Sequence, residues 1–269
     1  MQILKEFYYF LEHIFYTRQL LVTLIKNDFK KQYLGSYFGL VWAFAQPLSF
    51  LLVIWFVFTY GFRSAAHGDT PYFLWLASGM IPWFFISGAI SSGTNAIVSN
   101  AYLVKKVSFR VSILPLVQIG SALIIHIALV FFIVILYLLY GFNPSIYWVQ
   151  LPYFIFCCVI FVLGVSWLTS SIRVFVKDVS NAIGVLLQIG FWATPIFWNI
   201  SMIPSSYQWI FKLNPAYYIV QGFRDTFVNH IWFWEMPNTT FYFLSISSFL
   251  FVLGAVVFKR LRPHFGDVL

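Results

Sequence analysis

The side chains that most catalytic and metal sites require are scattered singly through this chain. Its eight acidic residues lie far apart in sequence, at Glu6, Glu12, Asp28, Asp69, Asp178, Asp225, Glu235 and Asp267. Cys157 and Cys158 are adjacent, a spacing that suits neither a disulfide framework nor a metal site. Acid–base and metal chemistry need side chains that converge on one place. The sequence therefore predicts no catalytic residue and no metal or other cofactor bound by this chain.

Apolar and aromatic side chains instead dominate the composition. The 269 residues are 61% hydrophobic, 22% aromatic and 9% charged. A soluble domain is about 45–50% apolar and about 25% charged, and a disordered chain is polar and poor in aromatics. So few charges cannot cover the surface of a soluble globule of this size. The composition predicts an integral membrane protein.

Long windows without Asp, Glu, Lys or Arg indicate where the membrane-crossing elements lie. Five such windows cover residues 32–62, 70–104, 111–172, 179–211 and 236–258. A bilayer core of about 30 Å needs about 20 apolar helical residues, so the longest window holds two spans, divided at residues 141–145. We therefore predict an all-α membrane protein with six transmembrane helices, at residues 39–60, 72–95, 113–140, 151–172, 180–198 and 238–258.

The basic residues are divided unequally between the two sides of the membrane that six spans define. An even number of spans puts both termini on one side, and 13 of the 16 Lys and Arg residues fall on that side. The other side has only Arg63, Lys212 and Arg224. The positive-inside rule places both termini in the cytoplasm. Much of the +8 net charge is thus a topology signal, and we expect no nucleic-acid partner.

Two stretches before the first span indicate cytoplasmic helices at the membrane interface. Residues 3–15 carry apolar side chains at helical spacing, and residues 20–34 carry Lys26, Lys30 and Lys31. We expect residues 1–35 to form these interface helices, of which the first is amphipathic. A simple anchor on the membrane surface is the alternative interpretation.

The long connection on the other side, residues 199–237, predicts two short helices. Apolar residues repeat there at helical spacing, and we expect helices over about 205–213 and 215–230 that re-enter the outer leaflet. A helix lying flat on the surface is the alternative. Residues 259–269 then form a cytoplasmic tail, and residues 1–269 as a whole form one transmembrane domain.

The predicted span interiors contain no Asp, Glu, Lys or Arg. His126 is their single candidate for a proton relay, and a lone His in an apolar helix more often serves packing. Ion-coupled pumps usually carry ionisable residues inside the membrane, so ion-driven transport is disfavoured. The dipeptide Gly-Lys of a phosphate-binding loop never occurs. If this chain takes part in energised transport, another polypeptide must hydrolyse ATP.

Proline also falls inside three of the predicted spans. Pro47, Pro82 and Pro195 each remove one backbone hydrogen bond. We therefore expect each of them to bend its helix.

Several segments carry a specific pattern. Leu24–Trp42 combines a charged helix, a Tyr-x-Gly-Ser turn and a Gly-Leu-x-Trp entry, and Gln46-Pro47-Leu48 follows one turn into the span. Later segments are Gly79–Trp83, Lys105–Pro115, Leu213–Tyr218 and Gly222–Asp225. Together they resemble the permease subunit of type-2 ATP-binding-cassette exporters. The resemblance is greatest to the branch that exports polysaccharides such as capsule, O-antigen and teichoic acid, and it covers nearly the whole chain.

The resemblance implies a homodimer in the bacterial inner membrane that works with two copies of a separate ATPase subunit. ATP and Mg²⁺ would bind that partner, and a lipid-linked glycan would cross at the dimer interface. We expect the basic cytoplasmic segments to contact the ATPase through Lys26, Lys30, Lys31, Lys105, Lys106, Phe109 and Arg110. Binding of anionic lipid headgroups by these bases is the alternative.

A path for a neutral polymer needs surfaces that bind sugars without trapping them. Aromatic faces stack on sugar rings, and hydroxyl groups exchange hydrogen bonds readily. The candidates are Trp42, Phe44, Trp55, Phe58, Tyr60, Trp83, Trp192 and Trp198. The alternative is that these rings form interface belts or face lipid.

The short helices after the fifth span would form an outer gate. Its candidate residues are Pro204, Trp209, Asn214, Pro215, Tyr217, Tyr218, Arg224 and Asp225. For Arg224 and Asp225 we expect an exposed local ion pair, which contributes little; bracing of the gate or contact with a substrate phosphate are the alternatives. Two other functions stay open: a permease of the same family that exports a drug or a lipid, and a membrane scaffold that transports nothing.

Overall fold

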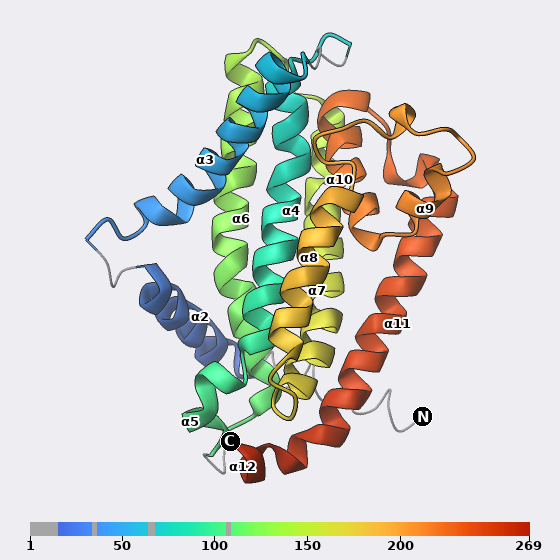
Figure 1. Cartoon of the computed structure of the whole chain (residues 1–269). Coiled ribbons are helices and arrows are strands. Elements are labelled where there is room, and N and C mark those ends of the chain that lie inside the picture. The colour runs from blue at the N-terminus through green and yellow to red at the C-terminus, as the bar shows by residue number, and fades with distance from the viewer. Residues whose placement is uncertain (1–15, 34–36, 64–67, 106–108) are drawn as a thin grey trace.

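The computed structural model describes residues 16–33, 37–63, 68–105 and 109–269, and in this part of the chain every regular element is a helix (Figure 1). The α-helices are α2 (Arg18–Tyr33), α3 (Val41–Phe56), α4 (Tyr72–Asn95), α5 (Ala101–Val104), α6 (Leu114–Leu139), α7 (Leu151–Arg173), α8 (Val179–Ala193), α9 (Gln208–Lys212), α10 (Pro215–Arg224), α11 (Pro237–Leu261) and α12 (Phe265–Val268). Shorter 3₁₀ and π turns are η1 (Val57–Gly61), η2 (Val98–Asn100), η3 (Val111–Ile113), η4 (Ile146–Gln150), η5 (Ile200–Met202), η6 (Asp225–Asn229), η7 (Phe233–Glu235) and η8 (Arg262–His264). The predicted interface helix at residues 3–15 lies outside the described residues.

Five helical stretches are long and apolar enough to cross a bilayer. They are Val41–Gly61, Tyr72–Asn95, Val111–Leu139, Ile146–Arg173 and Pro237–Val268. Each coincides with a predicted span, and the chain turns between α6 and η4 at Gly141, which has a positive φ of 87°. The class of the protein, an all-helical membrane protein, is confirmed.

The predicted fifth span is different, because its helix α8 has only 15 residues. At 1.5 Å per residue α8 is about 22 Å long, less than the bilayer core of about 30 Å. It ends at Thr194, whose backbone is extended (φ −86°, ψ 132°). The residue before a proline is pushed out of the helical conformation. Pro195 therefore ends the helix, and the prediction that it would bend a continuing helix was wrong, whereas Pro47 and Pro82 lie inside α3 and α4.

Helix α4 is the centre of the bundle. It is buried along most of its length and packs against α6, α7, α8, α10 and α3. Helices α7 and α11 are in extensive contact, and two glycines allow it. A Cβ atom on Gly254 would lie 2.3 Å from the carbonyl oxygen of Gly164, so the two backbones touch directly. Small residues at such crossings let membrane helices approach closely.

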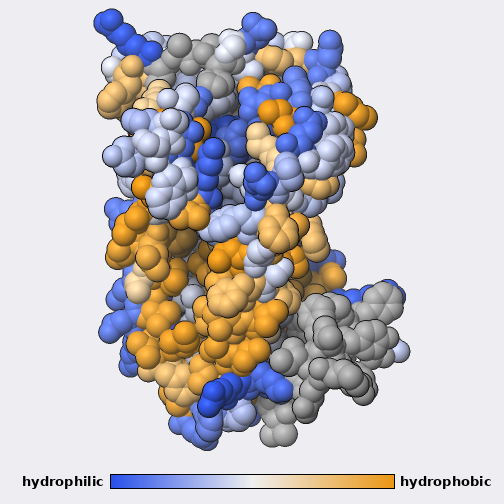
Figure 2. Space-filling model, turned by 90° about the vertical axis from the view of Figure 1, so that its right-hand side faces the viewer, coloured by the Kyte–Doolittle hydropathy of each residue, from blue (hydrophilic) through white to orange (hydrophobic). Residues whose placement is uncertain are grey.

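The bundle has two distinct ends. Helices α2, α5 and α12 lie at one end, which we call the terminal end, and η4, α9 and η7 lie at the other, which we call the loop end (Figure 1). Figure 2 shows the face that carries α11, where a hydrophobic band lies between a polar loop end and polar atoms at the terminal end. This surface matches a bilayer core with water on both sides.

Candidate functional site

A buried non-helical segment connects α8 to the loop end. Thr194–Phe197, which we call the exit segment, follows the last turn of α8, and its four residues are buried. The Thr194 amide still donates to the Gly190 carbonyl at 2.8 Å, and the Thr194 carbonyl accepts from the Ile196 amide at 2.7 Å. The buried carbonyl groups of Pro195, Ile196 and Phe197 need hydrogen bonds from elsewhere. The Tyr72 hydroxyl of α4 donates one of these bonds to the Phe197 carbonyl at 2.7 Å. Helix α10 supplies the bonds to the carbonyls of Pro195 and Ile196.

Arg224 of α10 is the main partner of the exit segment. Its guanidinium donates to the carbonyl oxygens of Pro195 and Ile196 and lies 3.6 Å above the ring of Trp75 in α4. The side chain is only 2% exposed. Arg is suited to this position because its planar fork can donate to two acceptors and stack on an aromatic face at once. Arg224 thus joins α10, α4 and the end of α8.

Asp225 does not share these partners. Its Oδ1 accepts hydrogen bonds from the side-chain amides of Gln221 at 2.9 Å and Asn229 at 2.7 Å, both on its own helical segment. Asp225 is also buried, with 6% of its surface exposed. The expected exposed pair between Arg224 and Asp225 was therefore wrong. Successive helical residues point in different directions, and tertiary packing covers both of them.

The remaining gate candidates lie in α9, in the first half of α10 and in the connections before these two helices. Asn214 caps α10, since its Oδ1 accepts from the Ala216 amide at 3.0 Å, while its Nδ2 donates to the Thr194 hydroxyl at 2.8 Å. Pro215 occupies the first turn of α10, where proline is tolerated. Tyr217 and Tyr218 are buried. Pro204 and Trp209 are exposed.

Helices α3 and α8 present open faces to the outside of the chain. Trp42 on α3, Tyr60 on η1, which continues α3, and Trp192 on α8 are more than half exposed. The rings of Phe50 on α3 and Phe191 on α8 lie 5.6 Å apart, which joins the two helices. Of the other predicted path residues, Phe44, Trp55, Phe58 and Trp198 are half-buried, whereas Trp83 is buried against Phe191.

Two aromatic residues on α3 extend this open face beyond the predicted set. Phe50 and Phe56 are both exposed and lie on the same helix as Trp42. The high share of aromatic residues was the signal that could have included them. The sequence did not show which aromatic side chains of α3 face outward and which pack against the bundle, because α3 is apolar on all sides.

Helix α2 attaches to the terminal half of the bundle through one face. The Gln118 amide of α6 donates to Asp28 at 2.6 Å, and the Ser121 hydroxyl donates to the Ile25 carbonyl at 3.3 Å. The Ile25 side chain occupies the space above Gly120, where a Cβ atom would lie 2.5 Å from it. The opposite face carries Lys26, Lys30 and Lys31, which are exposed.

The second group of predicted coupling residues lies at the same end. Lys105 is exposed, Phe109 and Arg110 are half-buried, and Lys106 lies outside the described residues. Burial and the nearby charge of Arg262 lower the pKa of Arg110. The tail after α11 thus belongs to this basic surface, and the buried Phe265 of α12 packs against Phe258. The sequence indicated the tail only as a topology signal, so this contribution was missed.

Comparison with known proteins gives the class to which this architecture belongs. Residues 19–228 match the family described as ABC-2 type transporter. The match covers well over half of the chain, so the chain belongs to the ABC-2 type transporter family. It includes α2, most of the bundle and α10, and thus every element that holds a predicted site residue.

Three individual proteins that are similar to this chain carry the same description. The chain is 29% identical over 255 residues to an O-antigen export system permease protein RfbA of Klebsiella pneumoniae, which covers 94% of this chain and 96% of that protein. A second RfbA of the same species is 27% identical over 256 residues with the same coverage. The O-antigen export system permease protein RfbA of Myxococcus xanthus is 25% identical over 254 residues, or 93% and 95% of the two chains.

Proposed function

We propose that this chain is the membrane permease of an ATP-driven exporter that moves a lipid-linked polysaccharide out of the cytoplasm across the inner membrane. The observation that carries this proposal is the similarity to O-antigen export permeases over 93–94% of the chain. The similarity includes the loop end as well as the bundle. A glycan substrate therefore fits the whole architecture and not only the shared family.

The proposed topology has six crossings with the terminal end in the cytoplasm. Helix α8 covers most of the bilayer core, and the exit segment completes the fifth crossing inside protein. Irregular backbone at membrane depth is tolerated where protein buries it, as at Thr194–Phe197. The short helices α9 and α10 then re-enter from the outer side. Most Lys and Arg residues lie at the terminal end, as the positive-inside rule requires.

The proposed path lies between two copies of the chain, along the open faces of α3 and α8. In an assembled membrane protein, an exposed helix face contacts either lipid or another subunit. The exposed Trp and Tyr rings on these faces can stack on sugar rings. Trp42, Tyr60 and Trp192 offer flat faces, and the last two lie toward the loop end of their helices. A glycan can slide along such faces, because no charged group on them traps it.

ATP hydrolysis on a separate subunit drives the path open and shut. We propose that this subunit contacts the exposed face of α2 and the basic surface around Lys105 and Arg110. Because α2 is fixed to α6 by Asp28 and Gln118, a push on α2 reaches the bundle directly. At the loop end, Arg224 makes α10 and the end of α8 move together.

The path is tested by removing its rings. We expect the combined change Trp42→Ala, Tyr60→Ala and Trp192→Ala to slow the appearance of surface glycan several-fold in a strain that lacks its own copy. The measurement is the rate at which labelled glycan reaches the cell surface, at equal amounts of permease in the membrane.

The matched control removes equally exposed rings elsewhere. Phe131 on α6, Phe156 on α7 and Phe241 on α11 are exposed on other helices, and we expect their joint change to Ala to leave export unaltered. Equal export rates in the two triple variants would remove the claim that α3 and α8 line the path.

A further inference from the structure

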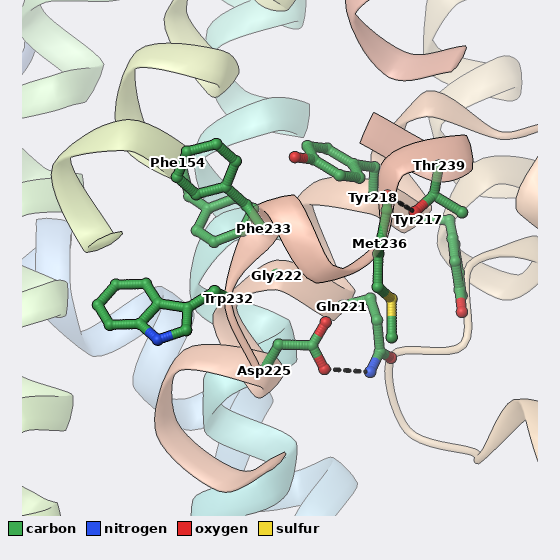
Figure 3. A pocket seen from close by; sticks show the side chains of 10 residues that line it. All are labelled: Phe154, Tyr217, Tyr218, Gln221, Gly222, Asp225, Trp232, Phe233, Met236 and Thr239. Atoms are coloured by element: carbon green, nitrogen blue, oxygen red, sulfur yellow. Dashed lines mark hydrogen bonds between the residues drawn. The ribbon is translucent and has the colours of Figure 1, made fainter. Parts of the chain in front are cut away.

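The short helices at the two ends of the bundle differ in what they present to the outside. At the loop end most of α10 is buried, and Figure 3 shows Phe154 of α7 and Phe233 of η7 next to it. Its polar groups also bond to one another, as in the hydrogen bond from Gln221 to Asp225 drawn there. At the terminal end, η8 and α12 bury only Phe265, and their other residues are exposed. Residues 262–269, which we call the folded tail, therefore offer a surface to a partner.

Phe265 fixes the folded tail to the bundle. Its fully buried ring lies 5.5 Å from the ring of Phe258 in α11 and 6.1 Å from the ring of Phe175, which follows α7. Leu269 also packs against the core, and its amide donates to the Phe265 carbonyl at 3.1 Å. A helix as short as α12 is not stable by itself. These contacts therefore give the folded tail its position.

The folded tail joins two connections of the terminal end. Through Phe265 it contacts Phe175, which belongs to residues 174–178 between α7 and α8. Its Arg262 lies near Arg110, which precedes η3. Figure 1 shows α12 beyond the ends of the long helices. Three segments that are far apart in the sequence thus form one surface at this end of the bundle.

The connection that the folded tail supports leads directly into α8, which forms one side of the proposed path. Residues 174–178 are a tight turn. The amides of Phe175 and Val176 both donate to the Ile172 carbonyl, at 3.0 and 2.9 Å, and the Val179 amide donates to the Val176 carbonyl at 3.3 Å. A short turn held by such bonds passes a displacement on to the next helix. A push on this surface therefore reaches α8.

The exposed side chains of this surface suit a protein better than a lipid. Apolar and charged residues of both signs lie together on it: Phe175, Val176, Lys177, Asp178, Arg262, Asp267 and Val268 are all exposed. Exposed apolar side chains with a polar rim are typical of protein contacts. Sites for anionic headgroups consist instead of clustered Lys and Arg. Headgroups also surround a bundle at its sides, whereas α12 lies beyond its end (Figure 1).

We propose that the folded tail is a docking contact for the ATPase subunit and holds residues 174–178 where that subunit can move α8. The inference rests on the proposed function. It adds a third contact to α2 and to the surface around Lys105 and Arg110. Helix α2 is attached to α6, so the folded tail supplies the more direct link to the path.

The contact is tested by cross-linking in the complex of the full chain with its ATPase subunit. Cys157 and Cys158 are buried, so a thiol-reactive benzophenone labels an introduced, exposed cysteine selectively. The variants are His264→Cys and Val268→Cys on the folded tail, and Tyr207→Cys at the loop end is the matched control; all three positions are exposed. We expect illumination to join several times more ATPase subunit to either tail variant than to the control.

The positioning role is tested with Phe265→Ala and Phe265→Leu. We expect Phe265→Ala to copurify with the ATPase subunit through the other two contacts but to stimulate ATP hydrolysis about tenfold less than the unchanged chain. Phe265→Leu still fills most of the space and should retain the stimulation. Full stimulation by Phe265→Ala would overturn this role.

The docking contact is overturned if the tail variants and the control give equal yields, or if the tail variants cross-link to phospholipid alone. Failure of the proposed function is distinct, because the ATPase subunit would then not copurify with the unchanged chain.

Discussion

At the scale of single residues, Arg224 stabilises the non-helical exit segment that follows α8. The exit segment leaves the carbonyls of Pro195 and Ile196 without helical partners, and Arg224 donates to both. The sequence placed Arg224 in an outer helix but gave no sign of its partners, which lie 28 and 29 residues earlier in the chain. Contacts over such a separation depend on how the helices pack.

We predict that Arg224→Ala destabilises the protein more than any change of an exposed base. Two buried carbonyl groups would lose their donor, at about 1–3 kcal/mol each. The measurement is the thermal unfolding midpoint of the detergent-solubilised protein, read with a thiol-reactive dye. Such a dye reports unfolding here because Cys157 and Cys158 are both buried.

Lys212→Ala serves as the control, since Lys212 is exposed on α9 at the same end. We expect its midpoint to equal that of the unchanged chain. An Arg224→Ala midpoint no lower than this control would show that the exit segment does not depend on Arg224.

At the scale of elements, α2 has one face for the bundle and one for a partner. Ile25 and Asp28 face α6, while Lys26, Lys30 and Lys31 lie exposed. Charge alone predicted which bases lie at this end. It did not predict the anchoring face, because the hydrogen bond between Asp28 and Gln118 joins residues 90 positions apart.

We predict that Lys30→Glu with Lys31→Glu weakens binding of the ATPase subunit and abolishes its stimulation by the permease. The two Lys residues would suit an acidic surface on the ATPase subunit. Glu at these positions would face that surface with the same negative charge, and such like-charge contacts cost several kcal/mol of binding free energy. The measurement is copurification with the ATPase subunit, together with the rate of ATP hydrolysis.

The control is Lys212→Glu, the same change of charge at the loop end. Both proteins should insert into the membrane normally. If the variant with Lys30→Glu and Lys31→Glu stimulates ATP hydrolysis as well as the unchanged chain does, these two residues bind lipid headgroups rather than the ATPase subunit.

At the scale of the whole molecule, the charge-free windows predicted the long helices well, because a bilayer core excludes charge over a fixed length. The same reasoning could not predict that α8 ends at Thr194, where a local effect of Pro195 overrides the apolar pattern. Nor could it tell the buried Trp83 from the exposed Trp192, since both lie in apolar helices.

The central claim is that this chain moves a glycan across the membrane at the expense of ATP. The most direct test uses inside-out vesicles that contain the chain and its ATPase subunit, supplied with the lipid-linked glycan on the outside. The measured quantity is the fraction of glycan that becomes protected from an added glycosidase. We predict that this fraction rises only when both ATP and the chain are present. Equal protection with and without the chain would contradict the account.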